Sequence, residues 1–451
     1  MMRQEGGARG GPCARRRRCA VALVLVAGCA YYHDPELGSD AGARLDAGGA
    51  ERDAGLDAGG AERDAGTDAG RDAGVDAGAR PDVDAGPTCA WGLTAAGACD
   101  DAVEVSAGGA HTCARRASGS VVCWGANTRG QLGIGTSDYT PHPLPGAAAD
   151  LADAVQISAG LNQTCAVLAS GAVDCWGYNG SGGLGDGTTS ARFTPAAVSD
   201  LTDAVEVATG NLHTCAVRAS GAVACWGGNS NGQVGDGTTN DRLTPVAVSG
   251  LADAVEISAG VTHACARRAA GGVVCWGANG HGQLGDHTTG TRYTPVAVSG
   301  LTDAVEVSAG LDHTCARRAS GAVVCWGANA GGQLGDGTTT LRTIPVVVVG
   351  LSDAVEVEAG GNHTCARRAS GTVLCWGAND HGQVGDGTVI NRLTPVSVSG
   401  FTDPVMLSAG DSHTCMRRAS GPVLCWGLNV FGQLGDSTTM DRFTPAAVRA
   451  P

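Results

Sequence analysis

A unit of about 50 residues recurs seven times in tandem, and this period constrains the fold more than any other feature of the sequence. Residues 301–350 represent the unit well, and one Trp marks the same position in every copy. Such a strict period indicates that each copy is one supersecondary unit that packs against its neighbours. Successive marker residues are 50 positions apart, except for 52 between the first two: Trp124, Trp176, Trp226, Trp276, Trp326, Trp376 and Trp426.

Each copy carries signals for about four short strands. In the fifth copy, residues 305–307 alternate so that their two valines fall on one face. Residues 313–318 and 322–326 are predicted to form a hairpin whose turn contains Gly321, which tolerates a positive φ. A last strand is expected near 345–348, where the proline favours a sheet edge or a strand start. Seven such copies predict an all-β fold, a seven-bladed β-propeller, because ring closure leaves only short, protected edges.

The composition fits many turns and argues against a nucleic-acid partner. The chain contains 73 Gly and only 4% aromatic residues, which suits short strands and tight turns better than an aromatic core. Its formal net charge is −14, and all 30 basic residues are Arg. An acidic chain of this kind lacks the basic surface that phosphate backbones require, so nucleic acid is not expected as a partner.

The first 28 residues resemble the export signal of a bacterial lipoprotein. Four consecutive arginines at 15–18 precede an apolar run, 19–27, that is too short to span a bilayer. The run ends in Val-Ala-Gly-Cys at 26–29, which resembles the lipobox after which such proteins are cut and acylated. The resemblance implies a lipid-carrying Cys29 and a location in the bacterial cell envelope, with the outer membrane or cell surface favoured. The alternative is an ordinary secretory signal with a chance cysteine.

Residues 29–88 are predicted to form a lipid-anchored, disordered linker. The segment repeats Asp-Ala-Gly with few apolar side chains, so it cannot bury enough surface to offset its ordering entropy. We expect it to act as a spacer, and calcium binding by its aspartates is the weaker alternative. Residues 89–100 are expected to cap the repeats or to supply a strand that closes the ring. The propeller itself is predicted over residues 101–451.

The residues of the repeat resemble a known family. In the fourth copy, Cys275-Trp276-Gly277 is followed by Gly-Gln-Leu-Gly at 282–285. This pattern is similar to the repeat of the regulator of chromosome condensation family, and the similarity covers residues 101–448. The resemblance implies a seven-bladed propeller, but not the nucleotide-exchange activity of the nuclear founder, because fold and function separate readily. Secreted bacterial members that bind other proteins through loops on one face are the better functional comparison.

The cysteines form a regular pattern. Of 19 cysteines, Cys13 and Cys19 fall in the signal and Cys29 at the lipid site, and the other 16 form pairs ten positions apart. In the repeats each pair brackets the hairpin turn symmetrically, so the two Cβ atoms face each other within reach of a disulfide. The even number of cysteines and the predicted export of the chain favour disulfides over metal binding. The pairs are Cys89/Cys99, Cys113/Cys123, Cys165/Cys175, Cys215/Cys225, Cys265/Cys275, Cys315/Cys325, Cys365/Cys375 and Cys415/Cys425.

Other recurring residues are interpreted as framework. A His recurs in six copies, with Gln163 in the second, and it is expected to hydrogen-bond a neighbouring strand because a catalytic His would be unique. An Asp recurs in a Gly-rich turn in six copies, with Ile134 in the first, where it would bond its own backbone; calcium is the weaker alternative. The marker Trp is expected to pack between blades. With no unique catalytic set or phosphate-binding loop, no cofactor and no metal are predicted. The histidines are His111, His213, His263, His313, His363 and His413, and the aspartates are Asp186, Asp236, Asp286, Asp336, Asp386 and Asp436.

Two sets of positions differ between copies: the two residues before each His, and the two after the repeated Asn of the W-G-x-N motif. A shared framework with varied loop positions is what a ring-shaped binding face would produce, and neutral drift at exposed positions is the competing explanation. Arg and aromatic side chains dominate binding hot spots. The predicted partner-binding residues are Arg129, Ser181, Asn231, His281, His381 and Phe431.

These features together predict a non-catalytic, surface-anchored module that binds a protein or a surface polymer through one loop face of a monomeric ring. One alternative is an extracellular enzyme acting on glycans or the cell wall, which would require a unique pair of carboxylates at the mouth of the ring. Asp380 and Asp411 are unusual at their positions, but they belong to different kinds of loop. The other alternative is a structural spacer or coat protein, which would self-associate without a specific ligand.

Overall fold

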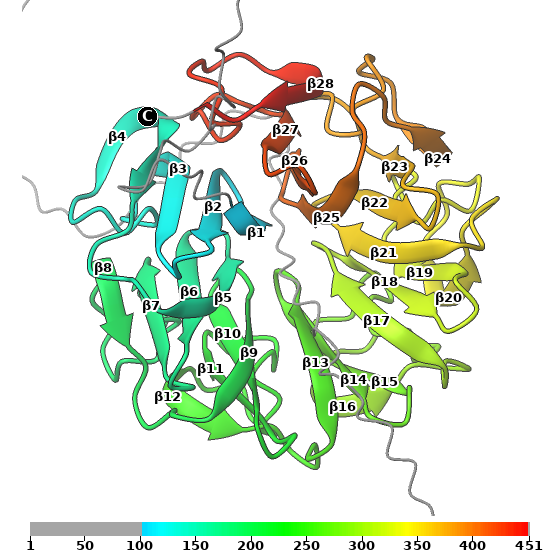
Figure 1. Cartoon of the computed structure of the whole chain (residues 1–451). Coiled ribbons are helices and arrows are strands. Elements are labelled where there is room, and N and C mark those ends of the chain that lie inside the picture. The colour runs from blue at the N-terminus through cyan, green and yellow to red at the C-terminus, as the bar shows by residue number, and fades with distance from the viewer. Residues whose placement is uncertain (1–101, 450–451) are drawn as a thin grey trace, which may run out of the picture. The chain divides into compact units, whose positions relative to one another are not determined.

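The repeats fold into a ring of seven blades, each a four-stranded antiparallel sheet (Figure 1). The structure, a computed structural model, describes residues 102–449; this part of the chain contains strands and lacks any helix that could cross a membrane. The predicted all-β, seven-bladed propeller is therefore confirmed. The predicted signal, linker and cap, with Cys29, Cys89 and Cys99, lie outside the described residues.

Each blade uses four consecutive strands of one repeat, ordered from the ring axis outward (Figure 1). The innermost strands of blades 1 to 7 are β1 (Ala102–Ala107), β5 (Ala154–Ala159), β9 (Ala204–Thr209), β13 (Ala254–Ala259), β17 (Ala304–Ala309), β21 (Ala354–Ala359) and β25 (Pro404–Ala409). The second strands are β2 (His111–Arg116), β6 (Gln163–Leu168), β10 (His213–Arg218), β14 (His263–Arg268), β18 (His313–Arg318), β22 (His363–Arg368) and β26 (His413–Arg418).

The two remaining strands complete the outer half of each blade. The third strands are β3 (Val121–Asn127), β7 (Val173–Gly177), β11 (Val223–Gly227), β15 (Val273–Gly277), β19 (Val323–Gly327), β23 (Val373–Gly377) and β27 (Val423–Gly427). The outermost strands are β4 (Asp138–Ala147), β8 (Arg192–Ala197), β12 (Arg242–Ala247), β16 (Arg292–Ala297), β20 (Arg342–Val347), β24 (Arg392–Ser397) and β28 (Arg442–Ala447). The proline of each outermost strand therefore lies at a sheet edge, as predicted.

A bulge in the innermost strands changes the predicted alternation of the valines. In blade 5 the pairing of β17 with β18 shifts just before Glu306, so Val305 is 37% exposed whereas Val307 is buried. The prediction that both valines share one face is wrong, because a bulge inserts an unpaired residue. Glu306 is buried instead, and its carboxylate accepts hydrogen bonds from Arg317 Nε at 2.7 Å and from the backbone N–H of Val357 in the next blade.

Each described cysteine pair forms a disulfide inside one blade, which confirms seven of the predicted bridges. In blade 5 the partners are directly opposite in β18 and β19, with their Cα atoms 4.0 Å apart. The pair is of the closer, non-hydrogen-bonded kind, because the turn bond joins Arg318 N–H to the Ala322 carbonyl and the two kinds of pair alternate. The bridges are Cys113–Cys123, Cys165–Cys175, Cys215–Cys225, Cys265–Cys275, Cys315–Cys325, Cys365–Cys375 and Cys415–Cys425.

The core lies between blades, and each marker Trp is at its centre. Trp326 of blade 5 has no exposed surface and packs with Leu284 and Val298 of blade 4 and with Val307 of its own blade. Its indole N–H donates to the carbonyl of Gln283, also in blade 4, at 2.9 Å. The same hydrogen bond to the preceding blade recurs for all seven marker residues, so the predicted packing of the Trp between blades is confirmed.

The recurring His and Thr extend this link between blades. Thr314 donates its hydroxyl proton to the same Gln283 carbonyl at 2.9 Å, and His263 Nε2 lies 3.0 Å from the Thr314 Oγ1. Because the only proton of the hydroxyl is already donated, Thr314 accepts and His263 carries a proton on Nε2. The predicted bond to a neighbouring strand is confirmed for five histidines: His111, His263, His313, His363 and His413.

A ring of seven glycines lets the loops approach each other around the axis. A Cβ on Gly108 would lie 2.5 Å from the carbonyl oxygen of Gly160 and 2.6 Å from the ring of its own His111. A Cβ on Gly410 of blade 7 would in turn lie 2.5 Å from the carbonyl oxygen of Gly108, so the circle closes. No larger residue fits at these positions without moving backbone. The seven are Gly108, Gly160, Gly210, Gly260, Gly310, Gly360 and Gly410.

Blade 7 meets blade 1 through the Trp, Thr and His hydrogen bonds that recur at most other junctions. Strand β1 lies beside β25 and β26 (Figure 1). Gln433 accepts from Thr112 and Trp124, and His413 bonds Thr112. All four strands of the first sheet and all four of the last come from a single repeat. Side-chain contacts and backbone hydrogen bonds between loops, rather than a strand shared between repeats, therefore join the two ends within the described residues.

One junction lacks this threonine. Ala264 stands where the other six repeats carry Thr, so His213, in the preceding blade, lacks the threonine hydroxyl that the other five histidines contact. Trp276 still donates to the Gln233 carbonyl at 2.9 Å, so that acceptor remains in place. The junction of blades 3 and 4 is therefore missing two of the recurring bonds, the one from Thr to the carbonyl and the one from His to Thr.

We predict that Ala264→Thr stabilises the propeller by about 1–3 kcal/mol, because it adds two buried hydrogen bonds that each typically contribute about 0.5–1.5 kcal/mol. The new hydroxyl would accept from His213 and donate to Gln233. The matched variant Thr314→Ala should destabilise by about 1–3 kcal/mol, since it leaves His263 without its acceptor. Urea denaturation of the oxidised chain measures both changes. A loss of stability in Ala264→Thr would show that the threonine does not act through this bond.

Candidate binding face

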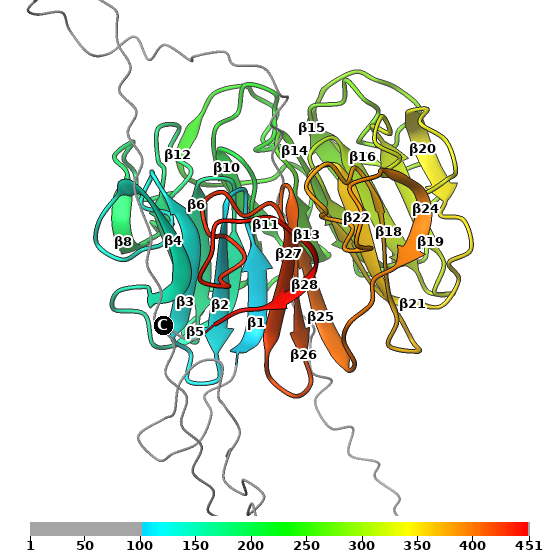
Figure 2. The same cartoon turned by 90° about the horizontal axis from the view of Figure 1, so that it is seen from above.

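The ring has two faces with different loops, between which the strands of each blade run (Figure 2). The innermost and third strands of a blade run parallel to each other, so the loops that follow them emerge on the same side. In blade 1 these loops are residues 108–110 and 128–137. We call this side, in all blades, the variable face. The opposite side carries the turns between second and third strands, 117–120 in blade 1, and is called the hairpin face.

The hairpin face repeats the same exposed chemistry around the ring. In blade 5 the Arg318 guanidinium contacts the Asp303 carboxylate at 2.9 Å, with both side chains more than a third exposed. The equivalent pair recurs in four further blades: Arg218–Asp203, Arg268–Asp253, Arg368–Asp353 and Arg418–Asp403. Such a uniform surface offers a partner little to distinguish one blade from another.

On the variable face, a buried polar cluster holds the long loop of each blade in place. In blade 4 the Asn279 amide donates to Asp286 Oδ1 and to the Thr288 carbonyl, both at 3.1 Å, and accepts from Leu284 N–H. Asp286 also accepts from Thr288 N–H and from Arg292 Nε. Although burial raises the pKa of Asp286, the hydrogen bonds from Thr288 and Arg292 outweigh it and hold that pKa below its usual value. The prediction that the recurring Asp bonds its own turn is confirmed.

Blade 1 reaches the same result with other residues. Ile134 replaces the Asp, and the blade has two additional residues. Asp138 takes over: it accepts from Asn127 Nδ2 at 3.3 Å, from Thr140 N–H at 2.9 Å, and lies 3.0 Å from His142 Nε2. The loop framework is therefore preserved although the sequence pattern changes.

All six predicted partner-binding residues lie in the long loops of the variable face. Arg129 and His281 are exposed, whereas the other four are half-buried. In five of the six loops the backbone N–H of this residue donates to Oε1 of the Gln two positions later, which fixes the backbone and leaves the side chain to vary. Their binding role remains a prediction: Arg129, Ser181, Asn231, His281, His381 and Phe431.

The two sets of varied positions meet on this face. His281 of blade 4 lies 3.4 Å from the carboxylate of Asp312, one of the residues before the blade 5 His. Gln283 donates to the same carboxylate at 3.0 Å. Burial raises the pKa of Asp312 above its usual value, although the neighbouring His281 partly offsets this effect. His381 makes a comparable cross-blade contact, 3.1 Å from Asp441 in blade 7. An inner and an outer varied residue therefore contact each other where blades 4 and 5 meet.

The recurring histidines are neutral framework residues. Burial lowers the pKa of five of them to about 3 and that of His213 to about 4. Their Nδ1 atoms have no hydrogen-bond partner in the described structure, so a second proton would be buried without an acceptor. In blade 2 the Gln163 amide donates to Thr214 at 3.0 Å, which is the bond that His makes elsewhere. The position therefore requires a hydrogen-bond donor, not a titrating group.

The described residues contain no group of three or more His, Cys, Asp or Glu arranged to hold a metal ion. The two unusual carboxylates differ in environment: Asp380 is exposed in the loop after β23, whereas Asp411 is 6% exposed in the loop after β25. The backbone of Asp411 accepts from Gly361 N–H at 3.2 Å, so it takes part in the contact between blades 6 and 7.

Two framework residues, the recurring Gln and Thr, were not predicted from the sequence. Gln283 holds its own loop with its side chain and the next blade with its carbonyl, and Thr314 lies between that carbonyl and His263. Both residues recur in six of the seven copies, which was the available signal. In blade 2 the Gln is replaced by Gly183 and the recurring His by Gln163, and the two replacements are linked. A Cβ on Gly183 would lie 2.5 Å from Oε1 of Gln163.

With the fold and this framework described, comparison with known proteins identifies the family. The RCC1-like domain model matches residues 78–416, and the regulator of chromosome condensation (RCC1) repeat model matches residues 407–433. The chain belongs to the RCC1-like domain family. It is 38% identical over 78 residues to the regulator of chromosome condensation of Xenopus laevis, which covers 17% of this chain and 18% of that protein. It is also 39% identical over 88 residues to the ultraviolet-B receptor UVR8 of Arabidopsis thaliana, which covers 19% and 20%. These matches span about a fifth of the length of the curated relatives.

Solved structures share the fold of this RCC1-like domain over most of its length. Yeast RCC1 (Prp20), bound to Kap60, superposes with a TM-score of 0.66 at 21% identity, covering 73% of this chain and 83% of that one. Human WBSCR16 superposes with a TM-score of 0.67 at 22% identity, covering 74% and 94%. At this level of identity the comparison establishes the propeller fold alone.

The buried histidines predict a steep loss of stability in acid. Their pKa of 6.5 in the unfolded chain is lowered to about 3 on folding, so the unfolded state binds more protons between these values. The contribution of the neutral histidines to the free energy of unfolding is therefore fully present above pH 6.5, and it is lost as the pH falls toward 3. The double variant His313→Gln/Gln333→Gly gives blade 5 the residues that blade 2 has at these positions, and it removes one buried histidine. Over part of this range, the dependence of unfolding free energy on pH should decrease by about 1.4 kcal/mol per pH unit, the value for one proton.

The single variant Gln333→Gly is the matched control, because it loses the same glutamine and keeps His313. Urea denaturation at steps between pH 7.5 and 4 measures all three proteins. If the double and single variants have the same pH dependence, the histidines do not cause the acid sensitivity.

Proposed function

We propose that this chain is a non-catalytic, surface-anchored member of the RCC1-like domain family that binds a protein partner through the variable face. One observation carries the proposal: the two sets of residues that differ between blades lie on one face, and they contact each other where blades 4 and 5 meet, at His281 and Asp312. The recurring residues hold those loops by hydrogen bonds to the loop backbone, and these bonds do not use the side chains at the varied positions. The hairpin face, by contrast, repeats the same Arg–Asp pair in five blades.

The composition of the variable face favours a protein over a surface polymer. It presents Arg129, His281, His381 and Phe431, and arginine and aromatic side chains are typical of the centres of protein interfaces. Relatives with this fold also have protein partners: yeast RCC1 (Prp20) has been crystallised bound to Kap60, and Prp20p has binding properties to Gsp1p and histones. The partner of this chain is proposed to be a protein of the cell surface or its surroundings.

The test uses the oxidised full chain as bait, with cross-linking to surface and secreted proteins. We expect a captured protein to be lost with Arg129→Ala/His281→Ala/His381→Ala/Phe431→Ala, because these changes remove the largest varied side chains while the framework bonds, which use backbone N–H groups, remain. The matched control carries four exposed hairpin-face changes: Ser170→Ala, Ser220→Ala, Ser320→Ala and Ser370→Ala. Loss with the control and retention with the first variant would move the binding site to the hairpin face. Capture of a polysaccharide alone would contradict the protein assignment.

We further propose that Cys29 carries the lipid that anchors the module to the bacterial cell envelope. The proposal rests on the Val-Ala-Gly-Cys sequence at 26–29 and on the arginines before it. Cys29→Ser should abolish incorporation of a labelled fatty acid and release the chain from the membrane fraction, since no acyl chains remain. Cys13→Ser, in the signal segment, is the control and should leave labelling unchanged. Labelling that persists in Cys29→Ser would exclude this site.

A further inference from the structure

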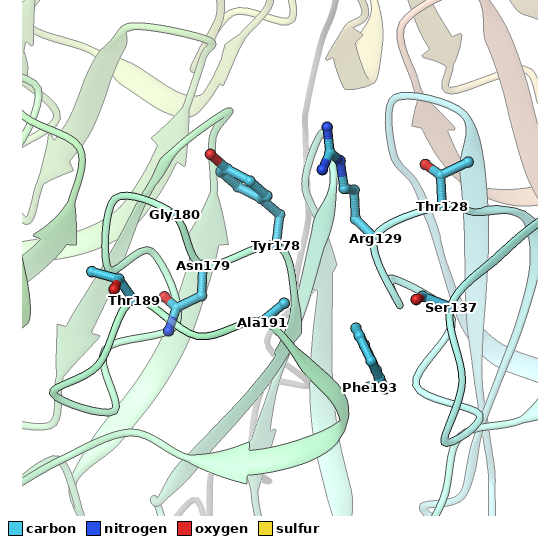
Figure 3. Close-up of a pocket in the computed structure, with 9 residues that line it drawn as sticks. All are labelled: Thr128, Arg129, Ser137, Tyr178, Asn179, Gly180, Thr189, Ala191 and Phe193. Carbon is cyan, nitrogen blue, oxygen red and sulfur yellow. The ribbon is translucent and has the colours of Figure 1, made fainter. Parts of the chain in front are cut away.

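A pocket of about 260 Å³ lies on the variable face where blade 1 meets blade 2 (Figure 3). Blade 1 contributes Thr128, Arg129 and Ser137, and blade 2 contributes Tyr178, Thr189 and Phe193. Arg129 and Tyr178 lie beside each other in the upper part of Figure 3, with the guanidinium over the Tyr178 ring, and Phe193 lies lower in the view. The volume suits one or two side chains of a partner rather than a larger cofactor.

Arg129 is held in place but not neutralised. Its guanidinium carbon lies 5.4 Å from the centre of the Tyr178 ring, a cation–π contact, and its backbone N–H donates to Gln131 Oε1 at 2.8 Å. No carboxylate of residues 102–449 lies within 4 Å of its guanidinium, whereas Arg192 nearby pairs with Asp186 at 2.8 Å. Most arginines of the ring have such an acidic partner within the chain. Arg129 therefore keeps a pre-positioned positive charge for a ligand.

This combination occurs at one of the seven junctions only. The residues equivalent to Arg129 in the other blades are Ser181, Asn231, His281, Gly331, His381 and Phe431, and those equivalent to Tyr178 are Ala126, Gly228, Ala278, Ala328, Ala378 and Leu428. The loop also presses closely on the aromatic floor, since a Cβ on Gly130 would lie 2.3 Å from the Phe193 ring. The pocket thus breaks the symmetry of the ring at a defined place.

We propose that this pocket binds an acidic residue, together with an apolar neighbour, in a peptide segment of the partner protein. This deepens the proposed function and rests on it. A guanidinium presents a planar pair of N–H donors that matches a carboxylate with two parallel hydrogen bonds. Phe193, which is 39% exposed, and the edge of Tyr178 offer apolar surface to the neighbouring side chain. Arg, Tyr and Phe in one pocket form the kind of anchor that contributes most of the affinity at protein interfaces.

The experiment titrates the full oxidised chain with the peptide N-acetyl-Phe-Glu-Phe-amide and follows the Nε–Hε resonance of Arg129 by NMR. We expect this resonance to shift, and the Gln counterpart of the peptide to bind about tenfold more weakly, because it lacks the charge that strengthens the hydrogen bonds. Arg129→Gln and Phe193→Ala should each weaken binding, and Arg129→Lys should restore only part of it because the planar fork is lost. Arg449→Gln, an arginine outside the pocket, is the control variant and should bind normally.

Other outcomes would overturn the proposal. Equal binding of the Glu and Gln peptides would exclude carboxylate recognition. Tighter binding of galacturonate or inorganic phosphate than of the Glu peptide, with the same shift at Arg129, would assign the pocket to an acidic glycan or to phosphate instead. If none of the probes shifts Arg129 while the four-residue variant of the variable face still loses the captured protein, the pocket assignment fails and the proposed function stands. If no probe shifts Arg129 and the four-residue variant still captures the protein, both the pocket assignment and the proposed function are refuted.

Discussion

The structure depends on a single backbone carbonyl in each junction, which receives two hydrogen bonds from the next blade in six of the seven junctions. Gln283 accepts from Thr314 and from Trp326, both at 2.9 Å, and six other junctions repeat the indole bond. A carbonyl has two lone pairs, so this arrangement uses its full capacity inside the core. The indole is thereby fixed between two sheets, and the sheets cannot slide without losing both bonds. Propeller geometry follows from repeating one junction until the circle of glycines closes.

The strict period made the fold predictable, but it hid the chemistry that joins the blades. The hairpins, the disulfides and the position of the Trp follow from local spacing, since Cys315 and Cys325 are equally distant from their turn. The partners of His263 and Gln283 lie in another repeat, and nothing within one repeat indicates which neighbour supplies them. The bulge before Glu306 was missed for a similar reason. The Glu306 carboxylate accepts a hydrogen bond from Val357 in the next blade. This contact between repeats changes the alternation of side chains that the sequence of one repeat predicts.

The exceptions to the pattern were more informative than the pattern. Gln163 and Gly183 change together because the amide occupies the space that a side chain at 183 would fill. Ala264 leaves His213 without the threonine acceptor found at other junctions, which shows how one substitution affects the adjacent blade. Met406 stands in blade 7 where five blades carry Glu and blade 2 carries Gln156, so the bridge seen at Glu306 is not made from that side chain to blade 1. The sequence revealed each exception, but only the packing revealed its consequence.

The same division of labour explains why one face is free to vary. The long loops are held by Asn279, Asp286 and Gln283 and by their equivalents, and the bonds that fix the loop backbone end on backbone groups or on recurring side chains such as Arg292. The side chain at position 281 is required by none of them, so it can change without loss of the loop. On the hairpin face the turns are short, and their exposed residues pair with each other, as Arg318 does with Asp303. A surface whose shape is fixed while its side chains are free is what selection for a partner can act upon. The junction of blades 1 and 2 is where this freedom has produced an Arg, a Tyr and a Phe around one pocket.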